Sequence, residues 1–207
     1  MRVFQIAVAG AATTMLAVAV AGCSHSTSST AKSGSSTSAA SSSSSAATSP
    51  AAGAPGPAGD YGNLLIQATD IQAPVPFTAT PPTNNPNGQP GVATTFKDED
   101  GSHVIKDTIL IYADPGAATD ALNAAKGQQG NAVKDPQTQP SNIGTGGTLL
   151  LGNTPDKSKG VTILLFTEGK ALVTLEFDGP SESLAPPEFV NDVGQKQQAA
   201  VKKGLGG

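Results

Sequence analysis

Two apolar runs in the C-terminal half of the chain give its clearest β-strand signal. Residues 161–166 and 171–177 are almost entirely apolar or β-branched, and a glycine-containing turn at residues 168–169 lies between them. Runs of this composition joined by so short a connection are typical of an antiparallel hairpin. Side chains alternate along a strand, so one face of the second run, which we expect to point into the core, carries Val173, Leu175 and Phe177.

A second hairpin is predicted from residues 92–96 and 103–112. The acidic segment between them contains Asp100-Gly101, and an Asp-Gly pair supplies the positive φ that tight hairpin turns require. Alternation along the return strand places Ile105, Ile109 and Ile111 on one face.

Two weaker stretches are further strand candidates. Residues 148–151 are apolar, and residues 132–134 precede two prolines, Pro136 and Pro140, that we expect to break the pattern. Together with the hairpins, these stretches predict an antiparallel sheet of about five or six strands.

Helical spacing of apolar residues occurs in three places. Leu64 to Ile71 reads as one short helix. A second helix is opened by Asp114-Pro115, since Asp caps the first amides and Pro suits the first helical position. A third is opened by Pro186-Pro187. The strands and helices do not alternate strictly, so we expect an α+β fold with two or three helices packed on one face of the sheet.

The N-terminal part of the chain has a different composition. Residues 1–22 are a short basic start, an apolar run and small residues, which is the layout of a secretory signal. Residues 23–59 are rich in Ser, Thr, Ala and Pro, and we expect them to form a disordered tether. The remaining residues, 60–207, suit a single α+β domain.

Val20-Ala21-Gly22-Cys23 joins the signal to the tether and resembles the lipobox of bacterial lipoproteins. The resemblance implies cleavage between Gly22 and Cys23, an S-diacylglycerol and an N-palmitoyl group on Cys23, and anchoring to the outer face of the cell membrane. An uncleaved membrane-spanning anchor is the alternative, because the apolar run has about the length that a span needs.

Composition argues against nucleic acid as a partner. Arg2 is the only arginine, so the chain after residue 22 has eleven lysines against sixteen acidic residues and a net charge of −5. Phosphate contacts made by Lys and Arg dominate affinity for nucleic acids, so an acidic chain without arginine is poorly suited to bind them.

Metal binding has one candidate segment. Asp98, Glu99, Asp100 and His103 are close in sequence, but Gly101 comes too early for a calcium loop of the EF-hand type. We therefore expect a solvated acidic turn, no metal site and no cofactor.

Catalysis has few candidate residues. Cys23 is the only cysteine, and the lipobox resemblance implies that its thiol is acylated. His25 falls in the tether, so His103 is the only histidine of the domain. A Ser–His pair would use His103 with Asp107 as its orienting acid, yet four residues along a strand separate them by about 13 Å. Glu168, Glu176 and Asp178 could act as paired carboxylates only if the fold brought them together, and their sequence pattern does not indicate this. We expect no catalytic residues.

Three stretches of the domain extend the resemblance: Leu64 to Ile71, Ile109 to Lys126 and Phe189 to Gln197. With the lipobox and the tether, they resemble small lipoproteins of mycobacteria and related actinobacteria, and extracytoplasmic sensor domains of mycobacterial Ser/Thr kinases. The resemblance implies a non-enzymatic, membrane-anchored protein that binds an envelope lipid, glycan or protein ligand. The alternatives are a lipid or glycolipid carrier and an envelope hydrolase.

Overall fold

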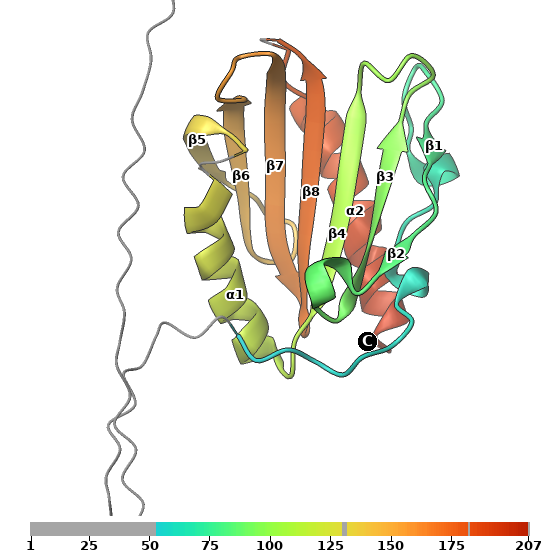
Figure 1. The fold of residues 1–207 in the computed structure, drawn as a ribbon, viewed down its shortest axis with the longest axis vertical. Helices are drawn as coiled ribbons and strands as arrows, with labels where there is room; N and C mark the ends of the chain where they lie inside the picture. Colours follow the sequence, from blue (N-terminus) through green and yellow to red (C-terminus); the bar gives the residue numbers. More distant parts are fainter. Residues whose placement is uncertain (1–52, 130–131, 182, 207) are drawn as a thin grey trace, which may run out of the picture. The chain divides into compact units, whose positions relative to one another are not determined.

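The computed structural model describes residues 53–129, 132–181 and 183–206. The signal segment, Cys23 and the tether up to residue 52 lie outside these residues. The described residues form an antiparallel sheet of eight strands in the order β1-β3-β4-β8-β7-β6-β5, with β2 also paired to β3 (Figure 1). The strands are β1 (Thr78–Ala79), β2 (Thr83–Asn84), β3 (Gly91–Lys97), β4 (Val104–Ile111), β5 (Lys134–Pro140), β6 (Thr145–Asn153), β7 (Lys159–Glu168) and β8 (Ala171–Pro180).

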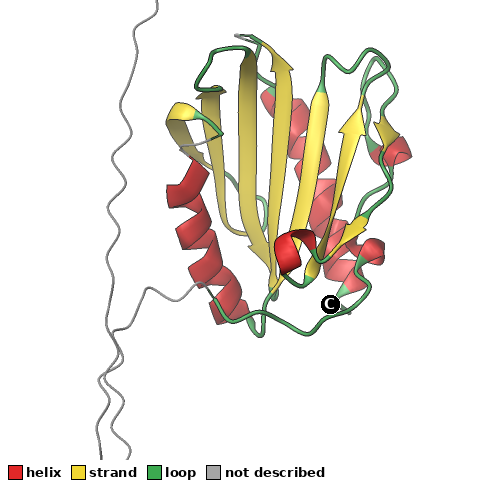
Figure 2. Ribbon diagram, viewed as in Figure 1, coloured by secondary structure: helices red, strands yellow, loops and turns green. Residues whose placement is uncertain are grey.

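The predicted α+β class is confirmed, and the sheet has more strands than the five or six expected. Figure 2 shows one sheet accompanied by helices. The two long helices are α1 (Pro115–Gln128) and α2 (Pro187–Gly204), and the short 3-10 helices are η1 (Gly62–Leu64), η2 (Ala68–Asp70) and η3 (Pro86–Gly88).

The expectation that the helices share one face of the sheet is wrong. Leu122 of α1 belongs to the same buried cluster as Ile163 and Leu165 of β7. Val193 of α2 belongs to a second cluster with Leu164, the residue between those two. Neighbouring residues of a strand point to opposite faces, so α1 and α2 cover opposite faces, and α2 passes behind the sheet in Figure 1. The reason is that β7 is apolar at consecutive positions and needs cover on both sides.

Both predicted hairpins are present; β3, β7 and β8 are longer than expected, whereas β4 is one residue shorter at each end than the predicted strand at residues 103–112. β7 pairs with β8, placing Leu164 opposite Leu175, and β3 pairs with β4, placing Phe96 opposite Ile105. β4 and β8 are themselves neighbours. The predicted inward face of β8 is confirmed, because Val173, Leu175 and Phe177 are all buried in the α2 cluster.

The predicted helix from Leu64 to Ile71 is wrong. This segment forms the separate turns η1 and η2, because Leu65 between them has an extended backbone with φ −79° and ψ 144°. The apolar residues are nevertheless buried, Leu64 at 1% exposure and Ile71 at 7%. The helical spacing of these apolar residues therefore corresponds to their burial in an irregular segment, and not to a regular helix.

The prolines near residue 136 do not end the strand they follow. The strand predicted at residues 132–134 begins only at Lys134; Pro136 lies inside β5 and Pro140 is its last residue. β5 is the edge strand of the sheet and pairs only with β6 in the described structure. An edge strand tolerates proline because some of its backbone N–H groups face away from the ladder. The register of β5 also shifts between Lys134 and Gln137, a further feature that weakens pairing with another strand.

The first described residues of the chain lie against the C-terminal end of β4. Pro55 forms an isolated bridge with Tyr112, and Gly56 donates its backbone N–H to the carbonyl of Ile111 at 2.8 Å. Val104, at the other end of β4, is about 23 Å away along the strand. The site described next lies at that other end.

Candidate ligand-binding cleft

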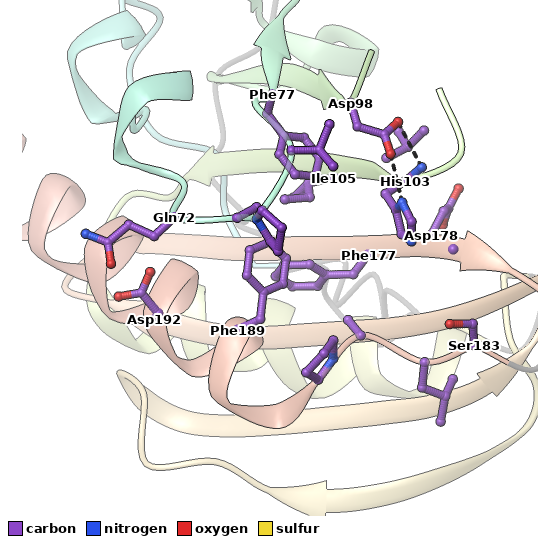
Figure 3. Close-up of a pocket in the computed structure, with 18 of the residues that line it drawn as sticks. Gln72, Phe77, Asp98, His103, Ile105, Phe177, Asp178, Ser183, Phe189 and Asp192 are labelled. Atoms are coloured by element: carbon purple, nitrogen blue, oxygen red, sulfur yellow. Dashed lines mark hydrogen bonds and ion pairs between the residues drawn. The ribbon is translucent and has the colours of Figure 1, made fainter. Parts of the chain in front are cut away.

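A cleft of about 720 Å³ lies where the start of β4 and the end of β8 meet the N-terminal end of α2 (Figure 3). The segment from Gln72 to Phe77, which follows η2, forms another wall of the cleft. Four separate parts of the chain therefore build it. A volume of this size falls in the usual range for small-molecule sites.

Three phenylalanines form an aromatic floor. Phe77 and Phe189 are stacked with ring centroids 6.4 Å apart, and Phe177 meets Phe189 edge-on at 5.9 Å. Both separations are within the range in which aromatic rings attract one another. Since each ring comes from a different segment, the pairs fix the position of α2 and of the 72–77 segment against β8.

The rim of the cleft carries exposed aliphatic side chains. Val75 is 45% exposed and Leu184 is 41% exposed, and among the described residues these are the large apolar side chains that stand out from the surface. Both line the cleft. Single exposed apolar residues need no explanation, and these two extend the apolar lining of the cleft to its rim.

The turn between β3 and β4 supplies a polar wall. Asp98 is buried, and its Oδ2 accepts hydrogen bonds from Ser102 Oγ at 3.0 Å and from His103 Nδ1 at 2.8 Å. Its Oδ1 accepts the backbone N–H of His103 at 3.1 Å. Burial raises the pKa of Asp98, but the hydrogen bonds from His103 and Ser102 outweigh burial and lower the pKa to about 2. The carboxylate is therefore a fixed negative charge that orients the imidazole.

A second buried carboxylate, Asp178, lies near the end of β8, on the face of the sheet opposite Phe177, because neighbouring residues of a strand point to opposite faces. Its Oδ2 is 3.1 Å from Lys106 Nζ and 3.3 Å from Lys159 Nζ. Lys106 also contacts Glu176 at 2.6 Å. Burial lowers the pKa of Lys106, but its bonds to Glu176 and Asp178 outweigh burial and raise it. The Oδ1 atom of Asp178 is buried without a hydrogen-bond partner among the described residues.

The catalytic pairings that the sequence analysis considered, His103 with Asp107 and the carboxylates of Glu168, Glu176 and Asp178, were not expected to be sites. Asp107 does not contact His103; it is fully buried in the sheet, and neither of its oxygens has a partner in the described part of the chain. Ser102 Oγ lies 2.9 Å from His103 Nδ1, the same nitrogen that Asp98 contacts. A catalytic triad needs its hydroxyl at the other ring nitrogen, so these three residues are not arranged as one.

The other carboxylates are held by neutral or cationic partners. Glu168 accepts a hydrogen bond from Gln198 at 2.8 Å, far along the sheet from Glu176. Burial raises the pKa of Glu176, against the lowering effect of its bond to Lys106. Within residues 53–129, 132–181 and 183–206, no three His, Asp or Glu side chains come close enough to share a metal ion.

The sequence located part of this site. Asp98 and His103 were singled out as neighbours in an acidic turn, and the hairpin register alone indicates that they flank it, because Lys97 pairs with Val104. The aromatic floor was missed. Phe77, Phe177 and Phe189 are far apart in the sequence, and their only signal was that the chain has six phenylalanines and no tryptophan.

No family model and no curated protein matches this chain. Its fold resembles the extracellular domain of PknH from Mycobacterium tuberculosis, with a TM-score of 0.50 over 70% of this chain and 94% of that domain, at 8% sequence identity. At the level of fold, this agrees with the predicted resemblance to the extracytoplasmic domains of mycobacterial kinases. None of the helices in the described residues has the length and hydrophobicity to cross a bilayer.

Proposed function

We propose that this protein is a lipid-anchored component of the cell envelope whose domain binds a ligand or partner and performs no catalysis. The observation that carries the proposal is the cleft at the N-terminal end of α2. It combines an aromatic floor with the exposed side chains of Val75 and Leu184. Concave, largely apolar sites with a few convergent polar groups are the usual form of small-molecule sites.

The proposed location rests on the N-terminal motif and on the structural neighbour. Val20-Ala21-Gly22-Cys23 supplies a cleavage site and a thiol for acylation, and the neighbour is named as an extracellular domain. Two or more acyl chains on Cys23 would hold the protein stably, since one chain alone gives marginal binding. The domain then lies on the outer face of the membrane.

Metabolic labelling with palmitate tests the anchor. Wild-type protein is expected to take up label, and Cys23→Ala is expected to take up none because the chain has no other cysteine. Ser24→Ala is the matched control and should label normally. Continued labelling of Cys23→Ala would disprove acylation at this residue.

Titration with the fluorescent apolar amine N-phenyl-1-naphthylamine tests the cleft. The full chain is expected to bind the probe, and Val75→Asp combined with Leu184→Asp is expected to weaken binding about tenfold, because two charges then replace the apolar rim. Ala124→Asp changes an exposed position of α1 outside the cleft and is the control. Equal binding by all three proteins would place the probe elsewhere and contradict the proposal.

A lipid or glycolipid carrier is the second candidate, and the apolar lining of the cleft favours it. A carrier holds its cargo during purification, whereas a sensor binds and releases a ligand. Organic extraction of the purified protein followed by mass spectrometry separates them. A lipid recovered in equal amount to the protein supports the carrier, and its absence supports reversible binding.

A further inference from the structure

The wall of the cleft that precedes β1, residues 72–77, makes no hydrogen bond to another described residue. Neither its backbone groups nor its side chains take part in any of the hydrogen bonds within the described part of the chain. Ala73 and Phe77 are half-buried, and the other four residues are exposed. A segment with few buried contacts and a solvent-exposed backbone belongs to the least stable parts of a fold.

The other walls of the cleft are tied down by hydrogen bonds. β4 and β8 pair along their whole length. On the opposite rim, Ser183 donates its N–H to the carbonyl of Pro180 at 3.0 Å, and the carbonyl of Pro186 accepts the N–H of Val190 at 3.0 Å. Residues 72–77 are therefore the wall that can move relative to the others.

Both ends of this segment are fixed. Before it, Lys196 of α2 donates its Nζ to the carbonyl of Asp70 at 2.8 Å. After it, Thr78 begins β1 and pairs with Lys97 of β3. A segment that is held at both ends and free between them can move only by rotation near its two ends.

Two prolines stiffen the middle of the segment. Proline fixes its own φ at about −65° and restricts the residue before it to extended conformations. Pro74 and Pro76 therefore limit themselves and also Ala73 and Val75. With so few internal conformations, the segment moves as one piece.

The exposure of Val75 indicates that the described state is an open one. Val75 lies on this wall and Leu184 lies on the opposite rim, and both are exposed while lining the cleft. An inward movement of the wall over an apolar ligand would remove both side chains from water, which is favourable. The ligand thereby binds the closed state more tightly than the open one, as a ligand that shifts a conformational equilibrium must.

We propose that residues 72–76 form a flap that opens to admit a ligand to the cleft and closes over it. One hinge lies beside Ile71, which is buried, and the other lies at Phe77, whose ring is stacked on Phe189. The inference rests on the proposed function, because a flap acts only if the cleft binds a ligand. It adds that binding occurs in two steps.

Stopped-flow mixing of the full chain with N-phenyl-1-naphthylamine tests for the second step. If the flap must move, the observed rate constant levels off as the probe concentration rises, because flap motion then limits the rate in place of diffusional encounter. A rate constant that rises linearly up to the solubility limit of the probe, with a single phase, would overturn the inference.

Substitution of the two prolines localises the motion. Pro74→Gly combined with Pro76→Gly gives the flap many more conformations to lose on closing. We expect this variant to bind the probe about tenfold more weakly and to reach a different plateau rate. Pro81→Gly combined with Pro82→Gly is the matched control, since both prolines are exposed and neither lines the cleft.

Circular dichroism checks that each double variant is folded. Equal affinity and an equal plateau rate in the flap variant and the control would show that residues 72–76 do not move on binding. If the flap variant does not fold, the concentration dependence measured on the wild-type protein still decides.

The outcomes distinguish this inference from the proposed function. If the wild-type protein binds the probe in one step, and the Val75→Asp, Leu184→Asp double variant still weakens binding, the cleft binds apolar ligands but has no flap. If the probe does not bind, or if the rim variant has no effect, ligand binding at the cleft itself is wrong.

Discussion

The side chain of Gln197 in α2 holds the backbone of the segment before β1 from both sides of Leu65. Its amide nitrogen donates to the carbonyl of Leu64 at 2.7 Å, and its carbonyl oxygen accepts the N–H of Ile66 at 3.1 Å. Gln197 is fully buried. A buried segment without helix or strand needs partners for its backbone groups, and this one glutamine supplies two of them.

Replacing Gln197 by Met therefore leaves a buried N–H and a buried carbonyl without partners. We expect Gln197→Met to lower the free energy of unfolding by about 2–4 kcal/mol. Gln195→Met, at an exposed position of the same helix, should change it by less than about 0.5 kcal/mol. Chemical denaturation measures both values. Hydrogen exchange should rise in residues 62–71 of Gln197→Met before it rises in the sheet, and uniform exchange would contradict this role.

Asp107 makes stability fall as pH rises. It is fully buried, and burial raises its pKa from 3.8 to about 8. Between these two values the unfolded chain releases a proton that the folded protein retains, so the free energy of unfolding decreases by up to about 1.4 kcal/mol per pH unit. Asp107→Asn keeps the shape and has no proton to lose. We expect Asp107→Asn to be more stable than wild type at pH 7.

Denaturation of wild type and Asp107→Asn across pH 5 to 8 checks this expectation. The difference in unfolding free energy should grow steadily with pH and level off above about 8. Asp100→Asn, at the exposed turn, is the control for losing a carboxylate and should show no such slope. A stability difference that does not change with pH would mean that Asp107 is ionised in the folded protein.

The sequence predicted those features that depend on near neighbours. Asp114 caps α1 as expected, accepting the N–H of Ala117 at 2.9 Å, and the strands around residues 161–177 are apolar enough to be recognised without tertiary information. Which face of the sheet each helix covers was harder to predict from the sequence. The sequence prediction put the helices on one face of the sheet, whereas the buried run of β7, Val161 to Thr167, is covered on both faces. An apolar run on one strand does not say which helix lies on which side.

The candidate site illustrates the same limit. Asp98 and His103 are brought together by a turn of a few residues, so their proximity followed from the sequence. The aromatic floor depends on where α2 docks against β8, and such long-range packing leaves no local pattern. Asp107 is a different case. Side-chain alternation along β4 places it on the same face as Ile105 and Ile109, and only its charge argued against burial.

Gly194 allows α2 to approach the sheet closely. A Cβ atom at this position would lie 2.6 Å from Leu164 Cδ2 and 2.7 Å from Ile143 Cδ1, and both side chains are buried. We expect Gly194→Val to lower the free energy of unfolding by about 1–3 kcal/mol through overpacking. Gly127→Val is the matched control, since nothing lies within 4 Å of a Cβ at that position of α1. Thermal unfolding of both variants measures the effect, and equal stability would show that α2 can move outward without cost.

The contribution of Asp98 to stability has the opposite pH dependence to that of Asp107. Substitution of Asp98 should also affect His103 at the cleft. Its pKa is lowered to about 2 from 3.8, so its hydrogen bonds stabilise the fold above pH 4 and are lost as pH falls toward 2. Asp98→Asn is expected to be less stable than wild type by about 1–3 kcal/mol at neutral pH.

The stability difference between Asp98→Asn and wild type should shrink as pH falls and be largely lost near pH 2, where about half of the wild-type carboxyl is protonated. Urea denaturation at neutral and acidic pH measures it, with Asp100→Asn as the control for charge. In Asp98→Asn the amide no longer fixes His103 by its charge, so ring proton resonances of His103 should broaden or shift. A sharp, unchanged His103 spectrum would show that the turn backbone alone positions the imidazole, and that Asp98 does not orient it toward the cleft.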